Sequence, residues 1–265
     1  MFYLILNLHF SMTKSIYILP VILLLLIAGC SSGLDTTNFT PSQKLAYAEQ
    51  LYNDEDYQEA LDEFQSLTLQ YPGNAVVDDA QYYLGMTRYQ RGEYILAAYE
   101  FSKLIKNMPA SKFMSKAQFM LAQSYYQLSP NYQLDQKFTK KAIEEFQAFI
   151  DFFPSDEKVK EAEQKINELN NKLAEKDYEI AHIYEKLDYN KAAIMYYDLI
   201  LDTYHDSKYA PMAMYRKIVL LIDGNKNSEA LQEIAKFIEL YPDNEKLDDV
   251  KELKNSLESK LSAAK

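Results

Sequence analysis

The sequence predicts an all-α protein, an α-solenoid built from five helical hairpins. Two observations carry this prediction. A skeleton of small and large apolar residues recurs along the chain, and no segment shows the period-two alternation that marks a β-strand. The clearest copy of the skeleton spans residues 78–109. Its members are Leu84, Gly85, Tyr89, Ala97, Phe101 and Pro109.

This skeleton indicates two antiparallel helices packed against each other. The small residues let the helices approach closely, the larger ones fill the seam, and proline ends the second helix because it has no backbone N–H to donate. The pattern resembles the tetratricopeptide (TPR) unit. One such hairpin cannot bury its apolar face alone, so we expect neighbouring copies that stack into a solenoid.

Five copies can be aligned from Pro41 onward. Each is marked by a small residue and a large one in its second helix: Ala60 and Phe64, Ala97 and Phe101, Ala142 and Phe146, Ala193 and Tyr197, and Ala230 and Ile234. An aromatic residue or methionine followed by proline closes four of the copies, whereas the fourth copy has His205 in the proline position. The fifth copy is the most degenerate.

Two irregularities divide the repeats. In the third copy 20 residues separate Ala122 from Ala142, where 12 separate Ala48 from Ala60, so about eight extra residues enlarge the hairpin loop. Residues 156–187 contain no proline or glycine and keep apolar residues near one helical face, which predicts a single long helix between repeats three and four. We therefore expect an N-terminal half of three repeats (42–154) and a C-terminal half of two repeats (155–265), which ends in an amphipathic capping helix.

The N-terminus carries the features of a secretory signal peptide at residues 1–29. Lys14 is followed by an apolar run that is shorter than the roughly 20 residues of a membrane span and ends in small residues before Cys30. The ending Ile27-Ala28-Gly29-Cys30 resembles a bacterial lipobox. This predicts that Cys30 is lipidated, that residues 30–41 form a tether, and that lipid anchors the protein in a membrane. The alternatives are an uncleaved anchor with an incidental cysteine, and translation that starts at Met12 rather than Met1.

Composition excludes several function classes. The chain has 28 basic and 39 acidic residues, a formal net charge of −11, which argues against binding to nucleic acid. Cys30 is the only cysteine, so neither a disulfide nor a cysteine-based metal site is available. The mature chain has only His182 and His205 as histidines and lacks a phosphate loop and the HExxH and GxSxG motifs. We expect no catalysis, no metal and no cofactor.

The order of these features resembles the BamD family, the outer-membrane lipoproteins of the β-barrel assembly (BAM) machinery. The resemblance rests on the lipobox, the five units, the enlarged third hairpin with residues 132–136, and the long helix with residues 173–176. It implies a non-catalytic adaptor that faces the periplasm. Its partners would be a barrel-forming, POTRA-bearing, BamA-like subunit, other BAM lipoproteins, and unfolded outer-membrane proteins. Another periplasmic TPR scaffold, such as a coordinator of the Tol-Pal system, is the alternative; that family lacks a lipid anchor.

The resemblance to TPR units also gives candidate binding residues, because first helices line the concave groove of a TPR stack. The fifth position of the first three units holds Leu45, Tyr82 and Phe119, and the twelfth holds Tyr52, Tyr89 and Tyr126. Successive members of each series are 37 residues apart, and Glu185 ends the second series. The hypothesis is a groove for an extended, aromatic-rich peptide, since tyrosine offers an apolar face and a polar tip. The alternative is that these side chains only pack the core.

In the C-terminal half the candidates for a partner interface are Tyr189, Lys191 and Arg216. They rest on the enrichment of aromatic residues and arginine at interfaces. The alternative is ordinary repeat packing for Tyr189 and a solvated charge for Lys191.

Overall fold

The computed structural model describes residues 36–263 and falls into two compact units, residues 1–40 and Pro41–Lys265. In the first unit, the described residues 36–40 form a turn in which Phe39 N donates a hydrogen bond to Thr36 O at 3.1 Å. The second unit contains every helix of the described residues. The predicted signal peptide and Cys30 lie outside the described residues.

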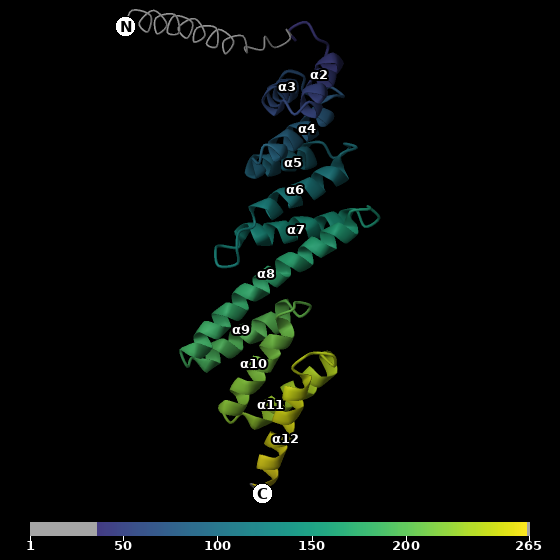
Figure 1. Ribbon diagram of the computed structural model, residues 1–265. Coiled ribbons are helices and arrows are strands. Elements are labelled where there is room, and N and C mark those ends of the chain that lie inside the picture. The colour runs from purple at the N-terminus through teal and green to yellow at the C-terminus, as the bar shows by residue number, and fades with distance from the viewer. Residues whose placement is uncertain (1–35, 264–265) are drawn as a thin grey trace, which may run out of the picture. The chain divides into compact units, whose positions relative to one another are not determined.

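Five antiparallel helical hairpins follow one another along the second unit (Figure 1). The five are α2 (Pro41–Asn53) with α3 (Tyr57–Gln70), α4 (Val77–Gln90) with α5 (Tyr94–Asn107), α6 (Met114–Leu128) with α7 (Lys137–Phe152), α8 (Val159–Lys186) with α9 (Asn190–Thr203), and α10 (Ala210–Asp223) with α11 (Asn227–Leu240). The last helix of the described residues, α12 (Leu247–Ala263), packs on α11. The predicted fold class is confirmed, including the long helix and the capping helix.

Four of the hairpin turns share one backbone conformation. Two residues before the second helix begins, Glu55, Gly92, Asp188 and Asn225 have φ between 55° and 74°. The next N–H donates to a carbonyl five residues back, as from Asp56 N to Leu51 O at 2.9 Å. This left-handed residue and the long bond form the Schellman ending of a helix, which reverses the chain within a few residues.

The third hairpin replaces that turn with a longer loop, residues 129–136. Gln136 fastens the loop internally because its Nε2 donates to Asn131 O and Leu134 O at 2.9 and 3.0 Å. The long helix α8 fastens it from outside: Lys172 Nζ bonds Ser129 Oγ at 2.9 Å and Lys176 Nζ bonds Leu134 O at 2.7 Å. The enlarged loop is therefore an ordered brace between the third hairpin and α8.

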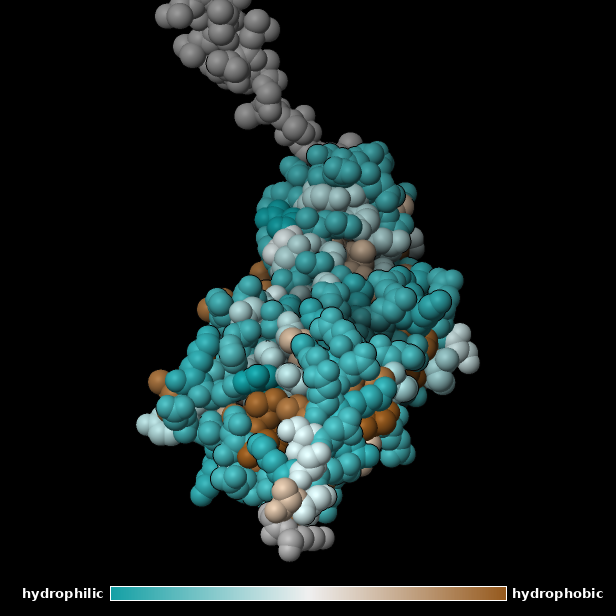
Figure 2. All heavy atoms as spheres, turned by 60° about the horizontal axis from the view of Figure 1, so that its bottom comes forward, coloured by the Kyte–Doolittle hydropathy of each residue, from teal (hydrophilic) through white to brown (hydrophobic). Residues whose placement is uncertain are grey.

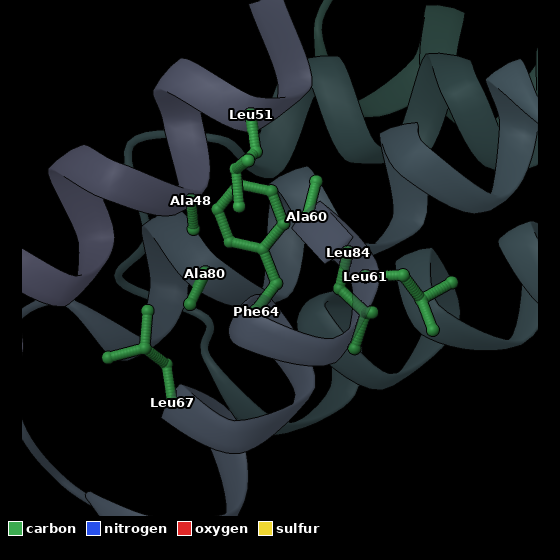
Figure 3. Close-up of a cluster of buried hydrophobic side chains, with 8 residues drawn as sticks. All are labelled: Ala48, Leu51, Ala60, Leu61, Phe64, Leu67, Ala80 and Leu84. Carbon is green, nitrogen blue, oxygen red and sulfur yellow. The ribbon is translucent and has the colours of Figure 1, made fainter. Parts of the chain in front are cut away.

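The core runs between neighbouring helices along the whole stack. Figure 3 shows one cluster in which side chains from α2, α3 and the next hairpin's α4 meet around the fully buried Phe64. The small residues decide how close the helices come. Gly85 of α4 faces the ring of Phe101, and a Cβ there would lie 2.6 Å from Phe101 Cε1.

Helix α8 belongs to two core clusters at once. Its N-terminal half packs Ala162 and Leu169 against α7, and its C-terminal half packs Ala174 and Ala181 against α9. This double role explains its length of 28 residues. The division of the chain into the halves 42–154 and 155–265 stays a prediction.

The surface is mainly hydrophilic on the face drawn in Figure 2, where hydrophobic residues gather in separate patches. Exposed apolar residues include Ile95, Leu96 and Tyr99 on α5, and Leu187 and Tyr189 at the turn between α8 and α9. None of the helices in the part of the chain that the structure describes is both long and apolar enough to cross a membrane.

Candidate peptide groove and partner surface

A ladder of hydrogen bonds links the first helices of the hairpins through the three tyrosines of the twelfth position. In this ladder each tyrosine tip contacts the next first helix along the chain. Gln90 Nε2 donates to Tyr52 Oη at 3.5 Å, Gln123 Nε2 and Gln127 Nε2 donate to Tyr89 Oη at 3.3 and 3.1 Å, and Tyr126 Oη donates to Glu168 at 2.8 Å. The tyrosines stand in register, and their tips are held from one repeat to the next.

The rings of these tyrosines are half-buried and packed edge-on against other aromatic rings. Tyr52 meets Tyr83 with centroids 5.5 Å apart, and Tyr89 meets Tyr94 at 5.2 Å. Lys165 Nζ lies 4.2 Å from the centroid of the Tyr126 ring, a cation–π contact. Each ring therefore packs on one side and keeps part of its surface accessible.

Of the fifth-position residues, Leu45 and Tyr82 are half-buried like the twelfth-position tyrosines, and Phe119 is buried. Tyr82 stacks on Phe113 with centroids 4.4 Å apart and planes 8° apart. Burial raises the pKa of Tyr82 to about 12, because its phenolate form would lose solvation. Leu45 is partly buried against the first core cluster.

Phe119 differs from the other five groove candidates. It is 4% exposed and packs edge-on against both Phe146 and Phe149 of α7. It is a core residue with almost no surface to offer a ligand. Phe119 therefore packs the core, as the alternative to the groove hypothesis proposed. The groove hypothesis now rests on the other five candidates: Leu45, Tyr52, Tyr82, Tyr89 and Tyr126.

Acidic side chains lie beside the tyrosines of the first two hairpins. Burial raises the pKa of Glu49, and the nearby Asp79 carboxylate raises it further. Lys112 Nζ pairs with Asp79 at 2.6 Å and partly offsets this negative field. A ligand that reaches this end of the groove would meet an apolar and acidic environment.

The partner-surface candidates fall into two groups. Tyr189 is 62% exposed at the turn before α9, and Lys191 in the first turn of α9 is also exposed. Arg216 is instead held inside the fourth and fifth hairpins, where its guanidinium pairs with Glu185. Tyr197 Oη donates to the same carboxylate at 2.9 Å. Tyr189 and Lys191 are exposed, whereas Arg216 is half-buried and its guanidinium is engaged by Glu185.

The ion pair of Arg216 explains why the tyrosine series ends. Glu185 occupies the twelfth position of the fourth repeat and contacts Arg216 on the next first helix, α10. The contact between successive first helices is thus kept, with an ion pair in place of an aromatic ring.

Sequence reasoning missed a set of buried polar residues on the same helices. Gln81 is fully buried, and its Nε2 donates to Glu100 O at 3.1 Å and to Glu100 Oε2 at 2.7 Å. Gln118 does the same with Glu145 at 3.1 and 2.8 Å. In the first hairpin Lys44 replaces the amide and pairs with Glu63 at 3.2 Å. These side chains join the two helices in each of the first three hairpins.

The two histidines of the described residues lie apart from any group of acids that could bind a metal. His182 is half-buried with Nδ1 unpartnered, and His205 is exposed, 3.5 Å from Asp206. Among residues 36–263, no group of three or more His, Cys, Asp or Glu side chains is arranged to hold a metal ion.

Comparison with known proteins identifies the family. Residues 38–222 match YfiO, a family of outer membrane lipoproteins. The chain belongs to the YfiO family. The matched range includes every groove and partner-surface candidate and ends close to the end of α10. Cys30 precedes it.

Two relatives of this chain carry the name outer membrane protein assembly factor BamD, which confirms the resemblance that the sequence motifs suggested. The protein from Rickettsia prowazekii is 28% identical over 210 residues, 78% of this chain and 83% of its own length. The protein from Caulobacter vibrioides is 21% identical over 175 residues, 66% of this chain and 57% of its own length.

Solved structures of TPR proteins are also similar to this chain. The TPR2AB domain of yeast Sti1, in a complex titled with pHSP90, has 17% identity and a TM-score of 0.41 over 76% of this chain and 78% of its own. The P58(IPK) TPR domain has 17% identity and a TM-score of 0.42 over 83% of this chain and 66% of its own.

Proposed function

We propose that this protein is a lipid-anchored adaptor of outer-membrane β-barrel assembly. Lipid on Cys30 holds it in the outer membrane, facing the periplasm. The C-terminal half (155–265) binds a barrel-forming, POTRA-bearing subunit, and the N-terminal half (42–154) receives unfolded outer-membrane proteins. Other lipoproteins of the assembly machinery are further partners. Membership of an outer membrane lipoprotein family and the names of the two relatives support this function. No catalytic step is involved.

The alignment of Tyr52, Tyr89 and Tyr126 on successive first helices supports the proposal of substrate binding. The hydrogen-bond ladder holds the hydroxyl groups of these tyrosines in place. An ordered row of half-buried rings suits an extended chain with alternating aromatic residues. A well-buried ring contributes roughly 1.5 to 3 kcal/mol, much of which is offset by the ordering of a flexible ligand. Binding is therefore weak and reversible, as transfer to a barrel-forming partner requires.

For the partner-binding part, we propose that Tyr189 and Lys191 contribute exposed contacts and that Arg216 acts indirectly. Through its pair with Glu185, Arg216 fixes α10 against α8 and so holds the surface in shape. An exposed tyrosine next to an exposed lysine can offer both apolar area and charge to a partner.

The groove is tested by crosslinking the full chain to an unfolded barrel protein that carries its C-terminal segment. We expect the triple variant Tyr52→Ala, Tyr89→Ala, Tyr126→Ala to lose most of the crosslinks. The matched control is Ile95→Ala, Leu96→Ala, Tyr99→Ala, which removes three exposed apolar side chains from a second helix. If the triple tyrosine variant keeps its helical circular dichroism and its crosslinks, the groove hypothesis is wrong.

Because the three alanines also remove bonds between repeats, a milder variant separates binding from folding. Tyr52 lies in the first helix, where only Gln90 bonds its tip at 3.5 Å. We expect Tyr52→Ala alone to leave the fold intact and to weaken crosslinking several-fold.

The adaptor role is tested by co-purification of the full chain extracted from membranes. Recovery of a POTRA-bearing barrel protein in near-stoichiometric amount is the expected result. Recovery of Tol-Pal proteins in its place would favour the alternative scaffold. The mass of the purified N-terminus tests lipidation at Cys30 and also distinguishes Met1 from Met12 in the precursor.

A further inference from the structure

The second helices α3, α5 and α7 begin with different surfaces at equivalent positions of the repeat. On α5 these positions hold Ile95, Leu96 and Tyr99, which are 51%, 43% and 63% exposed. Single exposed apolar side chains are ordinary, but three at the start of one helix form a patch. The repeat fold does not require this patch. The equivalent positions of the first, third and fifth repeats hold polar or charged residues: Gln58, Glu59 and Asp62; Lys140, Lys141 and Glu144; and Ser228, Glu229 and Gln232.

The start of α3, on one side of the patch, is acidic. Exposed carboxylates lie in its first turns and in the hairpin turn before it: Asp54, Glu55, Asp56, Glu59 and Asp62. Helix α3 itself contains no lysine or arginine that could neutralise them. This end of the helix therefore presents a surface of one charge sign.

A hydrogen bond from Arg91 shows that the acidic surface and the patch are neighbours. Arg91 lies in the turn before α5, and its Nη1 donates to Gln58 Oε1 of α3 at 2.7 Å. Its Nε pairs with Glu93 at 2.8 Å, so the positive charge of Arg91 is already balanced within its own hairpin. The acids of α3 keep their negative field beside the patch.

The start of α7, on the other side of the patch, is basic. Lys137 and Lys140 are exposed, and together with Lys176 of α8 they line a small cavity. Two acids, Asp135 and Asp177, line the same cavity. Because the lysines outnumber the acids, this end of α7 presents positive charge.

Helices α3, α5 and α7 follow one another along the stack, so the order of the three surfaces is acidic, apolar and basic (Figure 1). Successive repeats are related by one repeated step, and a two-fold axis through the middle of three such points exchanges the outer two. A second copy of the chain, turned about this axis, places its apolar patch on the first. The acidic surface of each copy then faces the basic surface of the other, as in an isologous interface. The surface is complementary to itself.

We propose that the patch of Ile95, Leu96 and Tyr99 is the centre of an interface between two copies of this chain. Tyr99 of each copy lies close to the two-fold axis, and Asp62 of each copy faces Lys140 of the other. The charge complementarity of the flanking surfaces selects a second copy as the occupant. Three side chains form a small apolar centre, so the dimer is weak and its amount depends on concentration. The interface includes neither the groove tyrosines nor the partner-surface candidates, and the proposal does not depend on the adaptor function.

The first test is disulfide crosslinking of the full chain in isolated membranes, with copper phenanthroline and air as the oxidant. We expect Tyr99→Cys, close to the axis, to form a disulfide-linked dimer. Gln232→Cys is the matched control, because it is exposed at the equivalent position of the fifth repeat and should stay monomeric. The parent chain, whose only cysteine is Cys30, gives the background.

Mixed disulfides test the two-fold arrangement. Asp62→Cys and Lys140→Cys should each stay monomeric alone, because neither position meets itself across the axis. When the two variants share one membrane, they should form a mixed dimer. If either variant crosslinks to itself as strongly as to the other, the two-fold arrangement is wrong.

Charge reversal tests the flanking surfaces. In the Tyr99→Cys background, Glu59→Lys with Asp62→Lys sets like charges opposite each other and should lower the dimer yield several-fold. Adding Lys137→Glu with Lys140→Glu to the same chain restores opposite charges and should recover the yield. Because these positions are exposed, the helical circular dichroism should be the same in all these variants.

Three results would overturn the proposal. Tyr99→Cys could give no more dimer than Gln232→Cys, which would mean that two copies do not meet at α5. It could crosslink only to a different protein, which would assign the patch to another partner. The yield could also stay unchanged after charge reversal in variants that remain folded.

Discussion

Tyr126 Oη donates a hydrogen bond to the Glu168 carboxylate at 2.8 Å and so joins α6 to the N-terminal half of α8. Glu168 is exposed, so the carboxylate stays solvated if the bond is lost. This contact is the last of the three tyrosine contacts in the ladder, and it links the third hairpin to the long helix α8.

The variant Tyr126→Phe removes this bond and keeps the ring. We expect the free energy of unfolding to fall by about 0.5 to 1.5 kcal/mol, the usual net value of one hydrogen bond. Urea denaturation measures it, and Tyr99→Phe is the control because that ring is 63% exposed on α5. An equal loss in both variants would contradict a specific role for the contact with Glu168.

Alkaline pH provides a second prediction. Burial, as the largest cause, raises the pKa of Tyr82, Tyr126 and Tyr209 to about 12, above the ordinary value of about 10. Between those two values the unfolded chain releases these protons and the folded chain keeps them, so stability is full below about pH 10 and falls as the pH rises toward 12. We expect the urea midpoint to drop between pH 9.5 and 11.5.

The same titration can be followed by tyrosinate absorbance. In the folded protein a fraction of the 23 tyrosines should titrate late, and Tyr126→Phe should reduce this late fraction. A folded protein whose tyrosines all titrate like those of the urea-unfolded chain would contradict the prediction.

The fold is predictable from the sequence because its signals are local. Residues 156–187 lack proline and glycine, and α8 occupies Val159–Lys186 within that stretch. It begins after Asp156, whose side chain accepts from Lys158 N at 2.9 Å in the preceding turn. Repeat spacing also places Leu45, Tyr82 and Phe119 at one helical register. Repeat spacing does not predict how deeply each of these side chains is buried, because burial depends on the neighbouring helix. Phe119 is buried because it packs against Phe146 and Phe149 of α7.

The buried glutamines could not be paired with their glutamates from the sequence, because an insertion changes the spacing between the two members of the pair. Gln81 and Glu100 are 19 residues apart, whereas Gln118 and Glu145 are 27 apart. The difference of eight equals the extra residues of the third hairpin loop. One signal was available: Lys44, Gln81 and Gln118 recur every 37 residues, as the tyrosines do. That periodicity marks equivalent positions but does not say that an amide is buried there.

Gly85→Ala tests a case in which the structure and the repeat pattern disagree. The equivalent residues Ala48, Ala122 and Ala181 suggest that alanine is acceptable at this position, and alanine raises helix propensity by about 1 kcal/mol. In the structure, however, the new Cβ would lie 2.6 Å from the fully buried Phe101 ring. We expect a net loss of stability of roughly 1 to 2 kcal/mol, since overpacking outweighs propensity.

A double-mutant cycle checks the cause. Phe101→Leu alone loses buried volume and destabilises the protein, but it also makes room beside residue 85. Adding Gly85→Ala to Phe101→Leu should then cost much less than it costs alone, or should stabilise the protein. Additive losses in the cycle would show that contact with Phe101 is not the reason.

Variants of the ion pair between Arg216 and Glu185 can distinguish a structural role of Arg216 from a direct contact with the partner. The Glu185 side chain is 13% exposed, so Arg216→Met leaves a largely buried carboxylate without its cation, although Tyr197 still donates to it. Arg216 is itself 31% exposed, which moderates the effect, and we expect a loss of roughly 1 to 3 kcal/mol. In the double variant Glu185→Gln, Arg216→Met, the buried charge is gone, and most of that stability should return.

Co-purification of the barrel-forming partner should return with the stability of the double variant, because Arg216 acts through the packing of α10 on α8. If the double variant regains stability but still fails to bind the partner while Tyr189 and Lys191 are intact, Arg216 contacts the partner directly.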